Sequence, residues 1–519
     1  FAEGKVDALY FALPTRVAAS QIHDRVNRIA RRLFGVAAPE VVRALPGDIL
    51  AGDAKAFSLP DFVTQWTDGQ NVDASVLRSR WPAERPKRFL AAPMAVGTID
   101  QALLGTIRVK HAHMRSFCLS RALLVVDEVH ASDIYVETLL TRLLDQHSRA
   151  GGEAMLLSAT LGSGARTRLL LGTKRARRHP MALADARAQP YPSLSWVENG
   201  KVVTQPRASQ KSRKTVSITP DPAIDDPEAL ARRTLAAADA GGRVLIVRNT
   251  VKDAMATALA FEAIAPDHPA LFRIGNVATL HHGRFARTDR TFLDAEVERR
   301  FGKQAALTPQ ILVGTQTLEQ SLDICSDFLL TDIAPIDVLL QRIGRLHRHH
   351  RARPEAFRNP DCIVLTPDNF EAVVNAREMK GPNGFGTVYD NILSLAATRQ
   401  LIGAGAIWTI PAMNRLLVEN ATHEEALGAL AEQLGETNPR WRNALTYLEG
   451  GALAKSQGAR AIAIDWQEAA CDFQLVDERA ATRLGLGDRE VAFANPPASP
   501  FPGAPVITRL AIPAHMLKG

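Results

Sequence analysis

The feature that most constrains the fold is the apolar run Leu123–Val126, which breaks directly into two acids and a histidine (LLVVDEVH). Four consecutive apolar residues, without the alternation of a half-exposed strand, predict a strand buried on both faces of a parallel sheet. Ligands of such sheets bind outside the carboxyl ends of the strands. Asp127, Glu128 and His130 are therefore the first candidate site residues.

The two adjacent acids suit nucleotide hydrolysis. In P-loop ATPases the first acid at such a strand end holds the Mg²⁺ that is bound to the phosphates of ATP. The second acid is suited to position and deprotonate the attacking water. Asp127 is accordingly the candidate metal ligand and Glu128 the candidate base, although a strand followed by two acids is too common to fix a function by itself.

Two further motifs follow in a fixed order. Residues 158–161 read SATL and residues 341–348 read QRIGRLHR. The order DEVH, SATL, QRIGRLHR is that of superfamily 2 helicases. Arg345 and Arg348 lie three apart, which predicts that they share one side of a helix and reach the γ-phosphate across a cleft, as arginine fingers do. The remaining nucleotide-site candidates of this set are Ser158, Thr160, Asp323 and Gln341.

Several other predicted strands end in residues that suit nucleic-acid phosphates. The strand at 6–13 ends in Pro-Thr-Arg, and a glycine after the strand in 89–100 would let a backbone N–H approach a phosphate closely. Similar residues end strands of the second half of the chain. The candidate nucleic-acid contacts are Pro14, Thr15, Arg16, Gly97, Thr98, Arg284, Thr315 and Gln316.

Strands and helices alternate through most of the chain, which predicts α/β domains with parallel, doubly wound sheets. We expect two such domains, at 1–205 and 206–370, and a mixed, mostly helical accessory domain at 371–519. Residues 35–90 indicate an irregular insertion, residues 165–213 a connector, and residues 277–281 a strand.

Composition narrows the class of protein. The chain has 519 residues and a formal net charge of +7, which fits a polyanionic partner. Its four cysteines are far apart and lack the spacing of a zinc site, which favours reduced thiols in a cytoplasmic protein. There is no signal peptide and no apolar run of the eighteen residues that a membrane span needs, so we expect no membrane partner.

A phosphate-binding GxxxxGK[ST] loop is absent from the sequence. We expect it one helix before the 6–13 strand, and hence before Phe1. The chain by itself is then expected neither to bind ATP tightly nor to hydrolyse it. Loss of a central strand would also leave two neighbouring strands of the first sheet unpaired.

Five segments carry a more specific resemblance. They read LLVVDEVHASD, LHHGRFARTDR, VGTQTLEQSLDI, QRIGRLHRHHR and WTIPAMNRLLVE. Together they resemble the helicase–nuclease of type I CRISPR systems, from near residue 1 to about residue 430. The histidine–aspartate nuclease domain that usually precedes the helicase in that family is not found in this sequence.

This resemblance implies two RecA-like domains, ATP and Mg²⁺ as cofactors, and ATP-driven 3′-to-5′ movement on single-stranded DNA. It also implies recruitment by an RNA-guided surveillance complex, with the nuclease in the same or a separate polypeptide. Two alternatives stay open at this point. One is another superfamily 2 helicase acting on RNA or DNA, and the other is a nucleic-acid-binding remnant that no longer hydrolyses ATP.

Overall fold

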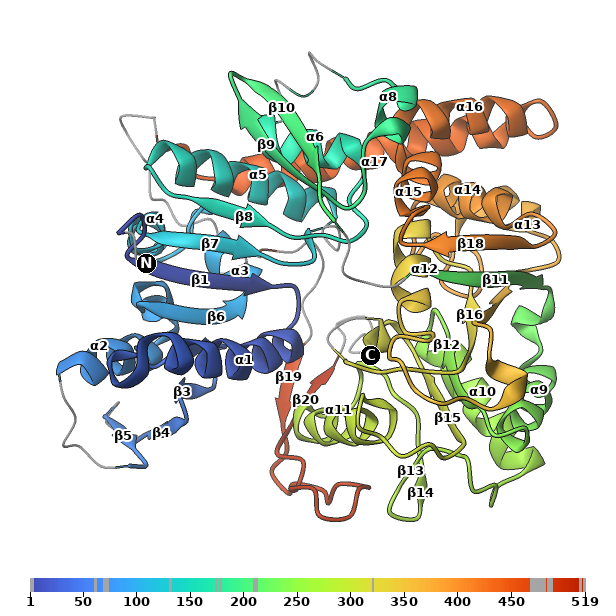
Figure 1. The fold of residues 1–519 in the computed structure, drawn as a ribbon, viewed down its shortest axis with the longest axis horizontal. Helices are drawn as coiled ribbons and strands as arrows, with labels where there is room; N and C mark the ends of the chain where they lie inside the picture. Colours follow the sequence, from blue (N-terminus) through green and yellow to red (C-terminus); the bar gives the residue numbers. More distant parts are fainter. Residues whose placement is uncertain are drawn as a thin grey trace.

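The computed structural model describes residues 4–59, 63–68, 74–129, 133–172, 176, 180–208, 213–319, 322–466, 482, 489–512 and 516. Two mainly parallel sheets, each flanked by helices, lie side by side (Figure 1). The predicted α/β class with two parallel-sheet domains and a largely helical C-terminal region is confirmed.

In the first sheet, the strand that precedes Pro14 and the strand that precedes Asp127 are neighbours, so their carboxyl ends lie next to each other. Its central strand, β1, pairs in parallel with both β6 and β7, with Leu13 opposite Thr98 and Ala12 opposite Val126. In spatial order the strands are β5 (Thr64–Trp66), β4 (Ala54–Ser58), β3 (Ile49–Ala51), β2 (Val42–Ala44), β6 (Met94–Thr98), β1 (Ala8–Leu13), β7 (Ala122–Val126) and β8 (Ala154–Leu156).

The described strands of this sheet form one unbroken ladder, so the expected gap beside a missing central strand is not seen. β1 is paired on both sides, and β7 is paired with β8. The open edge is instead β8, where Ala154 and Met155 are exposed.

Helices cover the first sheet, and residues 35–90 extend it. The segment predicted to be irregular forms β2 to β5, which are joined as antiparallel neighbours beyond the parallel core. The expected connector at 165–213 is also more ordered than predicted, because it contains helices and a hairpin of β9 and β10. These elements are α1 (Arg16–Phe34), α2 (Ala74–Ala83), α3 (Ile99–Leu103), α4 (Ala112–Ser120), α5 (Ile134–Arg149), α6 (Ser163–Leu171), α8 (Leu183–Ala188), β9 (Ser193–Glu198) and β10 (Lys201–Pro206).

The second sheet follows the predicted alternation closely. All of its strands are parallel except the last one at the edge. In spatial order they are β15 (Gln310–Gly314), β12 (Arg243–Val247), β16 (Phe328–Asp332), β17 (Asp361–Leu365), β11 (Lys214–Asp221) and β18 (Ala406–Ile410). The flanking helices are α9 (Pro227–Asp239), α10 (Val251–Ile264), α11 (Arg287–Phe301) and α12 (Ile336–Ile343).

Short polar residues start several of these helices directly after a strand. Thr15 accepts a hydrogen bond from the N–H of Ala18, and Asp226 accepts one from that of Ala229. Thr250 accepts one from the N–H of Asp253 while donating its hydroxyl proton to the Asp253 carboxylate. Such caps satisfy N–H groups that the first helical turn leaves unpaired.

The predicted strand at 277–281 is wrong in length. The chain makes a two-residue hairpin of β13 (Arg273–Ile274) and β14 (Val277–Ala278), turned at Gly275 with a φ of 59°. His281 then touches the sheet at a single bridge, opposite Gly314.

Part of the chain after residue 370 shares the second sheet and its core. β18 is hydrogen-bonded antiparallel to β11. Trp408, Leu417 and Leu430 are buried in the hydrophobic core that packs on the second sheet, called the second cluster, whereas the first cluster packs on the first sheet. The domain boundary at 370 stays a prediction, but β18, which lies beyond it, belongs to the second sheet. The helices in this region are α13 (Glu371–Asn375), α14 (Ile392–Ile402), α15 (Asn414–Thr422), α16 (Glu424–Gly435) and α17 (Arg440–Ile462), followed by the hairpin of β19 (Arg489–Ala492) and β20 (Arg509–Ile512).

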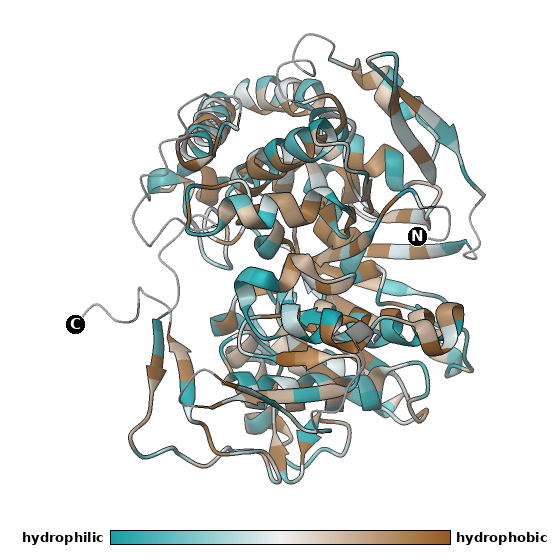
Figure 2. Cartoon of the chain, turned by 90° about the vertical axis from the view of Figure 1, so that its left-hand side faces the viewer, coloured by the Kyte–Doolittle hydropathy of each residue, from teal (hydrophilic) through white to brown (hydrophobic). Residues whose placement is uncertain are grey.

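The long helix α17 connects the two cores. Trp441 and Ala444, near its start, are buried in the second cluster, whereas Ala459 and the following Ala463 are buried in the first. Hydrophobic residues of the central strands are buried in both cores. Hydrophobic and hydrophilic residues alternate along the helices (Figure 2). Among the described residues, no helix combines the length and apolarity needed to cross a bilayer.

Candidate functional site

Asp127 and Glu128 lie at the carboxyl end of β7, as predicted. The N–H of Asp127 donates to the carbonyl of Ala12 at 2.9 Å, which continues the β1–β7 ladder by one residue. The N–H of Glu128 donates to Oδ1 of Asp127 at 2.9 Å, and Glu128 has a φ of 54°. A non-glycine residue in this left-handed region is strained, and such strain clusters at functional sites. His130 lies outside the described residues.

The Ser158–Thr160 segment is tied to the same loop. The N–H of Leu157 donates to the carbonyl of Val126, and the N–H of Val129 donates to the carbonyl of Leu157. Thr160 is buried, and its hydroxyl has no hydrogen-bond partner within the part of the chain that is described. A buried hydroxyl without a partner fits a site that a ligand or a domain movement completes.

Arg345 and Arg348 do not lie on a helix, contrary to the prediction. Helix α12 ends at Ile343, and Gly344 is its cap, so Arg345 lies in the turn that follows. Arg345 is buried and donates to the carbonyls of Glu319 and Leu322. Arg348 is more exposed and donates Nε to the carboxylate of Asp323 at 2.7 Å.

Charges from both domains meet at Arg345. Burial, with a smaller contribution from the positive charge of Arg348, lowers the pKa of this arginine to about 10. Glu128, Asp323 and Glu319 act in the opposite direction and favour the charged guanidinium. The Glu128 carboxylate and the Arg345 guanidinium therefore interact across the space between the two sheets. Nε of Arg345 is buried, with no hydrogen-bond partner in the described ranges.

Asp323 and Gln341, the other nucleotide-site candidates, lie on the same side of the second domain. Burial by itself would raise the pKa of Asp323, but its contacts with Arg348 and His349 keep that pKa below its usual value. Asp323 is therefore an ion-pair partner of Arg348 in this conformation. Gln341 is partly exposed on the last turn of α12.

The Pro14–Arg16 segment forms the start of α1. Thr15 is the N-cap residue of this helix, and Nη2 of Arg16 donates to the carbonyl of Pro46 at 2.7 Å. Pro14 and Arg16 are partly exposed. The Thr15 hydroxyl therefore already has a structural role, whereas Arg16 keeps exposed surface for a phosphate.

Packing accounts for Gly97 without a phosphate. A Cβ at this position would lie 2.6 Å from the Tyr10 hydroxyl oxygen and from the Ala44 carbonyl oxygen. Both distances are too short for any side chain, so glycine is required by the sheet itself. The carbonyl of the neighbouring Thr98 accepts a hydrogen bond from the Tyr10 hydroxyl at 2.8 Å. Thr98 is buried.

The predicted nucleic-acid residues of the second domain differ in exposure. Arg284 is exposed, whereas Thr315 is only 2% exposed. The side-chain amide of Gln316 donates to the carbonyl of Asn249 at 2.6 Å. In this conformation, Arg284 is thus more accessible to a phosphate than Thr315.

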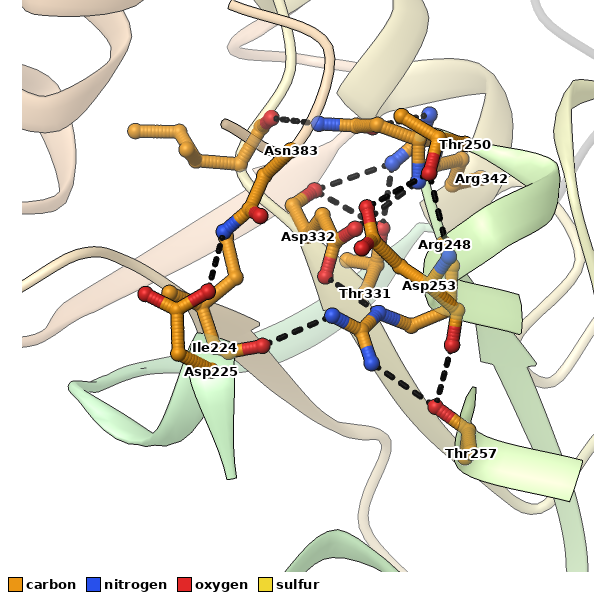
Figure 3. A network of polar contacts seen from close by, with 12 residues as sticks. Ile224, Asp225, Arg248, Thr250, Asp253, Thr257, Thr331, Asp332, Arg342 and Asn383 are labelled. Carbon is orange, nitrogen blue, oxygen red and sulfur yellow. Dashed lines mark hydrogen bonds and ion pairs between the residues drawn. The ribbon is translucent and has the colours of Figure 1, made fainter. Parts of the chain in front are cut away.

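The second domain contains a buried polar network that the sequence did not indicate (Figure 3). At its centre, Arg342 donates to Glu319 at 2.7 Å, to Thr331 at 2.7 Å and to Tyr389 at 2.8 Å. A second pair, Arg248 and Asp332, lies 2.8 Å apart in the same network. Because Arg342 belongs to the QRIGR motif, the sequence could have singled it out. Its partners could not be predicted, because they come from segments that are distant in the sequence.

Helix α15 makes a second set of contacts that the sequence did not indicate. The fully buried carboxylate of Glu419 accepts hydrogen bonds from the N–H of Ser163 at 2.8 Å and from its hydroxyl at 2.7 Å. Arg415 donates to the carbonyl of Leu161 and to Glu419. These bonds hold the loop that follows Ser158–Thr160 against the second half of the chain.

An oxygen-rich Mg²⁺ site fits Asp127, because a carboxylate at the edge of a sheet is the hard ligand that this ion prefers. Within the described ranges there is no group of three or more His, Cys, Asp or Glu side chains that could hold a metal ion. The ion would thus rely on Asp127 together with water and the phosphates of a nucleotide.

Comparisons with known proteins agree on one family. Residues 240–351 match the family model described as CRISPR-associated nuclease/helicase Cas3, C-terminal. The chain is 33% identical over 376 residues to the Cas3 endonuclease/helicase of Escherichia coli, covering 70% of this chain and 40% of the relative. It is 30% identical over 532 residues to that of Thermus thermophilus, covering 93% of this chain and 55% of the relative. The chain therefore spans about half the length of these relatives.

Solved structures give the same result. The crystal structure of T. fusca Cas3 matches with a TM-score of 0.71 and 28% identity, covering 93% of this chain and 53% of that one. Structures of the same protein with AMPPNP, ADP and ATP match similarly, and a pre-nicking CRISPR RNA-guided surveillance complex matches with a TM-score of 0.63 and 26% identity. In sequence and in fold, the chain belongs to the CRISPR-associated Cas3 family of nuclease/helicases.

Proposed function

We propose that this chain is the motor of an ATP-dependent helicase that moves 3′-to-5′ on single-stranded DNA during CRISPR interference. The observation that carries the proposal is the position of Asp127 and Glu128 at the carboxyl end of β7, in a chain similar to the Cas3 nuclease/helicases. Glu128 also favours the charged form of Arg345, which comes from the other domain. A nucleotide bound between Glu128 and Arg345 would interact with both charges, so its hydrolysis would change the attraction between the two domains.

The proposed roles follow from position and chemistry. Asp127 holds Mg²⁺, which neutralises phosphate charge, and Glu128 orients the attacking water and accepts its proton. Arg345 stabilises charge on the γ-phosphate from the second domain. The other residues of the proposed nucleotide site are His130, Ser158, Thr160, Asp323, Gln341 and Arg348.

The proposed DNA path uses residues at the strand ends of both sheets. Threonine, arginine and backbone N–H groups bind phosphates without reading bases. The net charge of +7 supports such a partner. The path comprises Pro14, Thr15, Arg16, Gly97, Thr98, Arg284, Thr315 and Gln316, with Arg16 and Arg284 the most accessible contacts in this conformation.

The proposed partners are inferred from what the relatives and the matching structures are named. One matching structure is a surveillance complex, and the relatives are named as nucleases as well as helicases. We infer that this chain acts in the cytoplasm on DNA opened by an RNA-guided complex, with a nuclease domain in the same or a separate polypeptide.

The glutamate-to-glutamine substitution at position 128 tests the proposed hydrolytic pair. In the full-length protein, Glu128→Gln should keep ATP affinity within a few-fold and abolish turnover, because the amide cannot accept the water proton. Equilibrium binding of labelled nucleotide and a phosphate-release assay measure the two properties. Turnover equal to that of the unsubstituted protein would contradict the role of Glu128.

The two alternatives predict different responses to nucleic acid. An RNA helicase would hydrolyse ATP faster with single-stranded RNA than with DNA, and a binding remnant would not hydrolyse ATP with either. The intact DEVH motif and both arginines argue against a remnant that has lost hydrolysis. Comparing ATP turnover of the full-length protein on DNA, on RNA and without nucleic acid separates the three cases.

A further inference from the structure

A tight turn in the first domain presents one carboxylate to the second domain. Residues 45–48 read LPGD and connect β2 to β3. The N–H of Asp48 donates to the carbonyl of Leu45 at 3.1 Å, and Gly47 has a φ of 89°. Proline at the second position and a positive-φ glycine at the third are the features of a type II turn. The turn therefore fixes where Asp48 lies.

Three arginines from three segments surround this carboxylate. Nη2 of Arg43 lies 3.6 Å from Oδ2 of Asp48, and Nη2 of Arg16 lies 3.9 Å from it. Nη2 of Arg287 lies 3.2 Å from both carboxylate oxygens. Arg287 is the first residue of α11, so its contact joins the two domains, which face each other here along α1 and α11 (Figure 1).

The cluster carries more positive charge than Asp48 neutralises. Burial lowers the pKa of Arg16, and Arg287 and Arg43 lower it further, while Asp48 alone opposes them. Nε of Arg43 is buried and, among the described residues, has no hydrogen-bond partner. One carboxylate has two oxygens, whereas three guanidinium groups offer many donors. Three positive charges and one negative charge leave the cluster with a net charge of +2, so it can accept a further anion.

The cluster is accessible to a ligand. The side chains of Arg287, Arg16, Asp48 and Arg43 are 60%, 39%, 27% and 24% exposed. A phosphodiester carries one negative charge and oxygens that accept hydrogen bonds from guanidinium groups. Unlike a buried ion pair, this cluster can exchange its anion without unfolding its surroundings.

We propose that Arg16, Arg43 and Arg287 form a binding site for a backbone phosphate of single-stranded DNA, in which Asp48 is an internal counter-ion that the phosphate displaces. The inference rests on the proposed function for its ligand and adds Arg43, Arg287 and Asp48 to the binding surface. Because Asp48 also holds Arg287, an entering strand releases one contact between the two domains.

The first experiment removes the competing carboxylate. Binding of a fluorescent oligothymidylate to the full chain is measured by anisotropy at about 50 mM salt without nucleotide. Asp48→Asn should tighten binding about two- to five-fold, the range expected for a partly exposed ion pair. Asp53→Asn is the matched control, because it removes the same charge from a nearby ion pair with Arg31.

The second experiment removes the arginine of the second domain. Arg287→Ala should weaken binding about two- to five-fold and make the log–log salt slope shallower by about 0.7, the value for one phosphate contact on a single strand. The matched control is Arg299→Ala on the same helix, since Arg299 is exposed and paired with Glu296. Unchanged thermal unfolding shows that each variant is folded.

The outcomes separate the site from the proposed function. If Asp48→Asn binds no more tightly than Asp53→Asn, or weakens binding, Asp48 is a structural bridge and the phosphate site is wrong. If Arg287→Ala behaves like Arg299→Ala, Arg287 does not contact the strand and the site is also wrong. If the unsubstituted chain fails to bind the oligonucleotide at all, the proposed DNA path itself is contradicted.

Discussion

A fully buried arginine, Arg342, holds four segments of the second domain together. It donates hydrogen bonds to Thr331 and Asp332 at the end of β16 (Figure 3). It also donates to Asn249 after β12, to Glu319 and to Tyr389. Burial raises the pKa of Glu319 even with this arginine beside it. Removing the arginine would leave that carboxyl group buried without its charged partner.

Substituting Arg342 should therefore destabilise the second domain strongly. Arg342→Met should lower the free energy of unfolding by about 3–5 kcal/mol, the usual cost of leaving half of a buried ion pair. Chemical denaturation followed by circular dichroism measures it. Arg348→Met is the control in the same motif and should cost less than about 1 kcal/mol, because its pair with Asp323 is largely exposed.

A double substitution checks the cause. Arg342→Met combined with Glu319→Met should recover part of the lost stability, because no charge is then left buried alone. A cost for Arg342→Met no larger than that for Arg348→Met would contradict the structural role of Arg342.

At single positions, the sequence predicted where a strand ends better than which distant residues surround a side chain. The acids at 127 and 128 could be placed at a strand end because an apolar run stops abruptly there. The packing that requires glycine at position 97 could not be predicted, because it comes from Tyr10 and Ala44, which are distant in the sequence. The position of Arg345 outside a helix depends on Gly344, which ends α12 one turn early.

At the scale of elements, the edge strand β18 determines how much of the chain the second domain requires in order to fold. β18 covers the open side of β11, and the helices after it are buried in the same cluster. The alternation of strands and helices predicted that these strands are parallel, because a helix after each strand returns the chain to the same edge of the sheet. Their spatial order could not be predicted, since β11 also pairs with the distant β17. The pairing of β11 with β18 could not be predicted, because nearly two hundred residues separate the partners.

Fragments of two lengths test this arrangement. A fragment of residues 213–435 should be soluble and unfold cooperatively on heating. A fragment of residues 213–370 should aggregate or lack a cooperative transition, because the edge of β11 and the apolar surface under α14 to α16 become exposed. Cooperative unfolding of the shorter fragment at a similar temperature would contradict the shared core.

At the scale of the whole molecule, the two domains are connected both by helix α17 and by side-chain contacts between them. Helix α17 has its first residues in one core and its last in the other. Glu419 and Arg415 hold the loop after Thr160, and Asp48 contacts Arg287 on the opposite side. Nucleotide-dependent movement would therefore have to break contacts such as the exposed one at Asp48 while α17 keeps the domains connected.

We propose that ATP is hydrolysed between the domains, with Arg345 acting on a nucleotide held by the first domain. The most direct test is ATP turnover by the Arg345→Ala variant of the full-length protein in the presence of single-stranded DNA. Arginine fingers contribute about 10³–10⁵ in rate, so turnover should fall by orders of magnitude. Nucleotide affinity should change much less, and unchanged thermal unfolding should show that the variant is folded. A two- or three-fold drop in turnover would instead indicate a purely structural role for Arg345 and contradict hydrolysis between the domains.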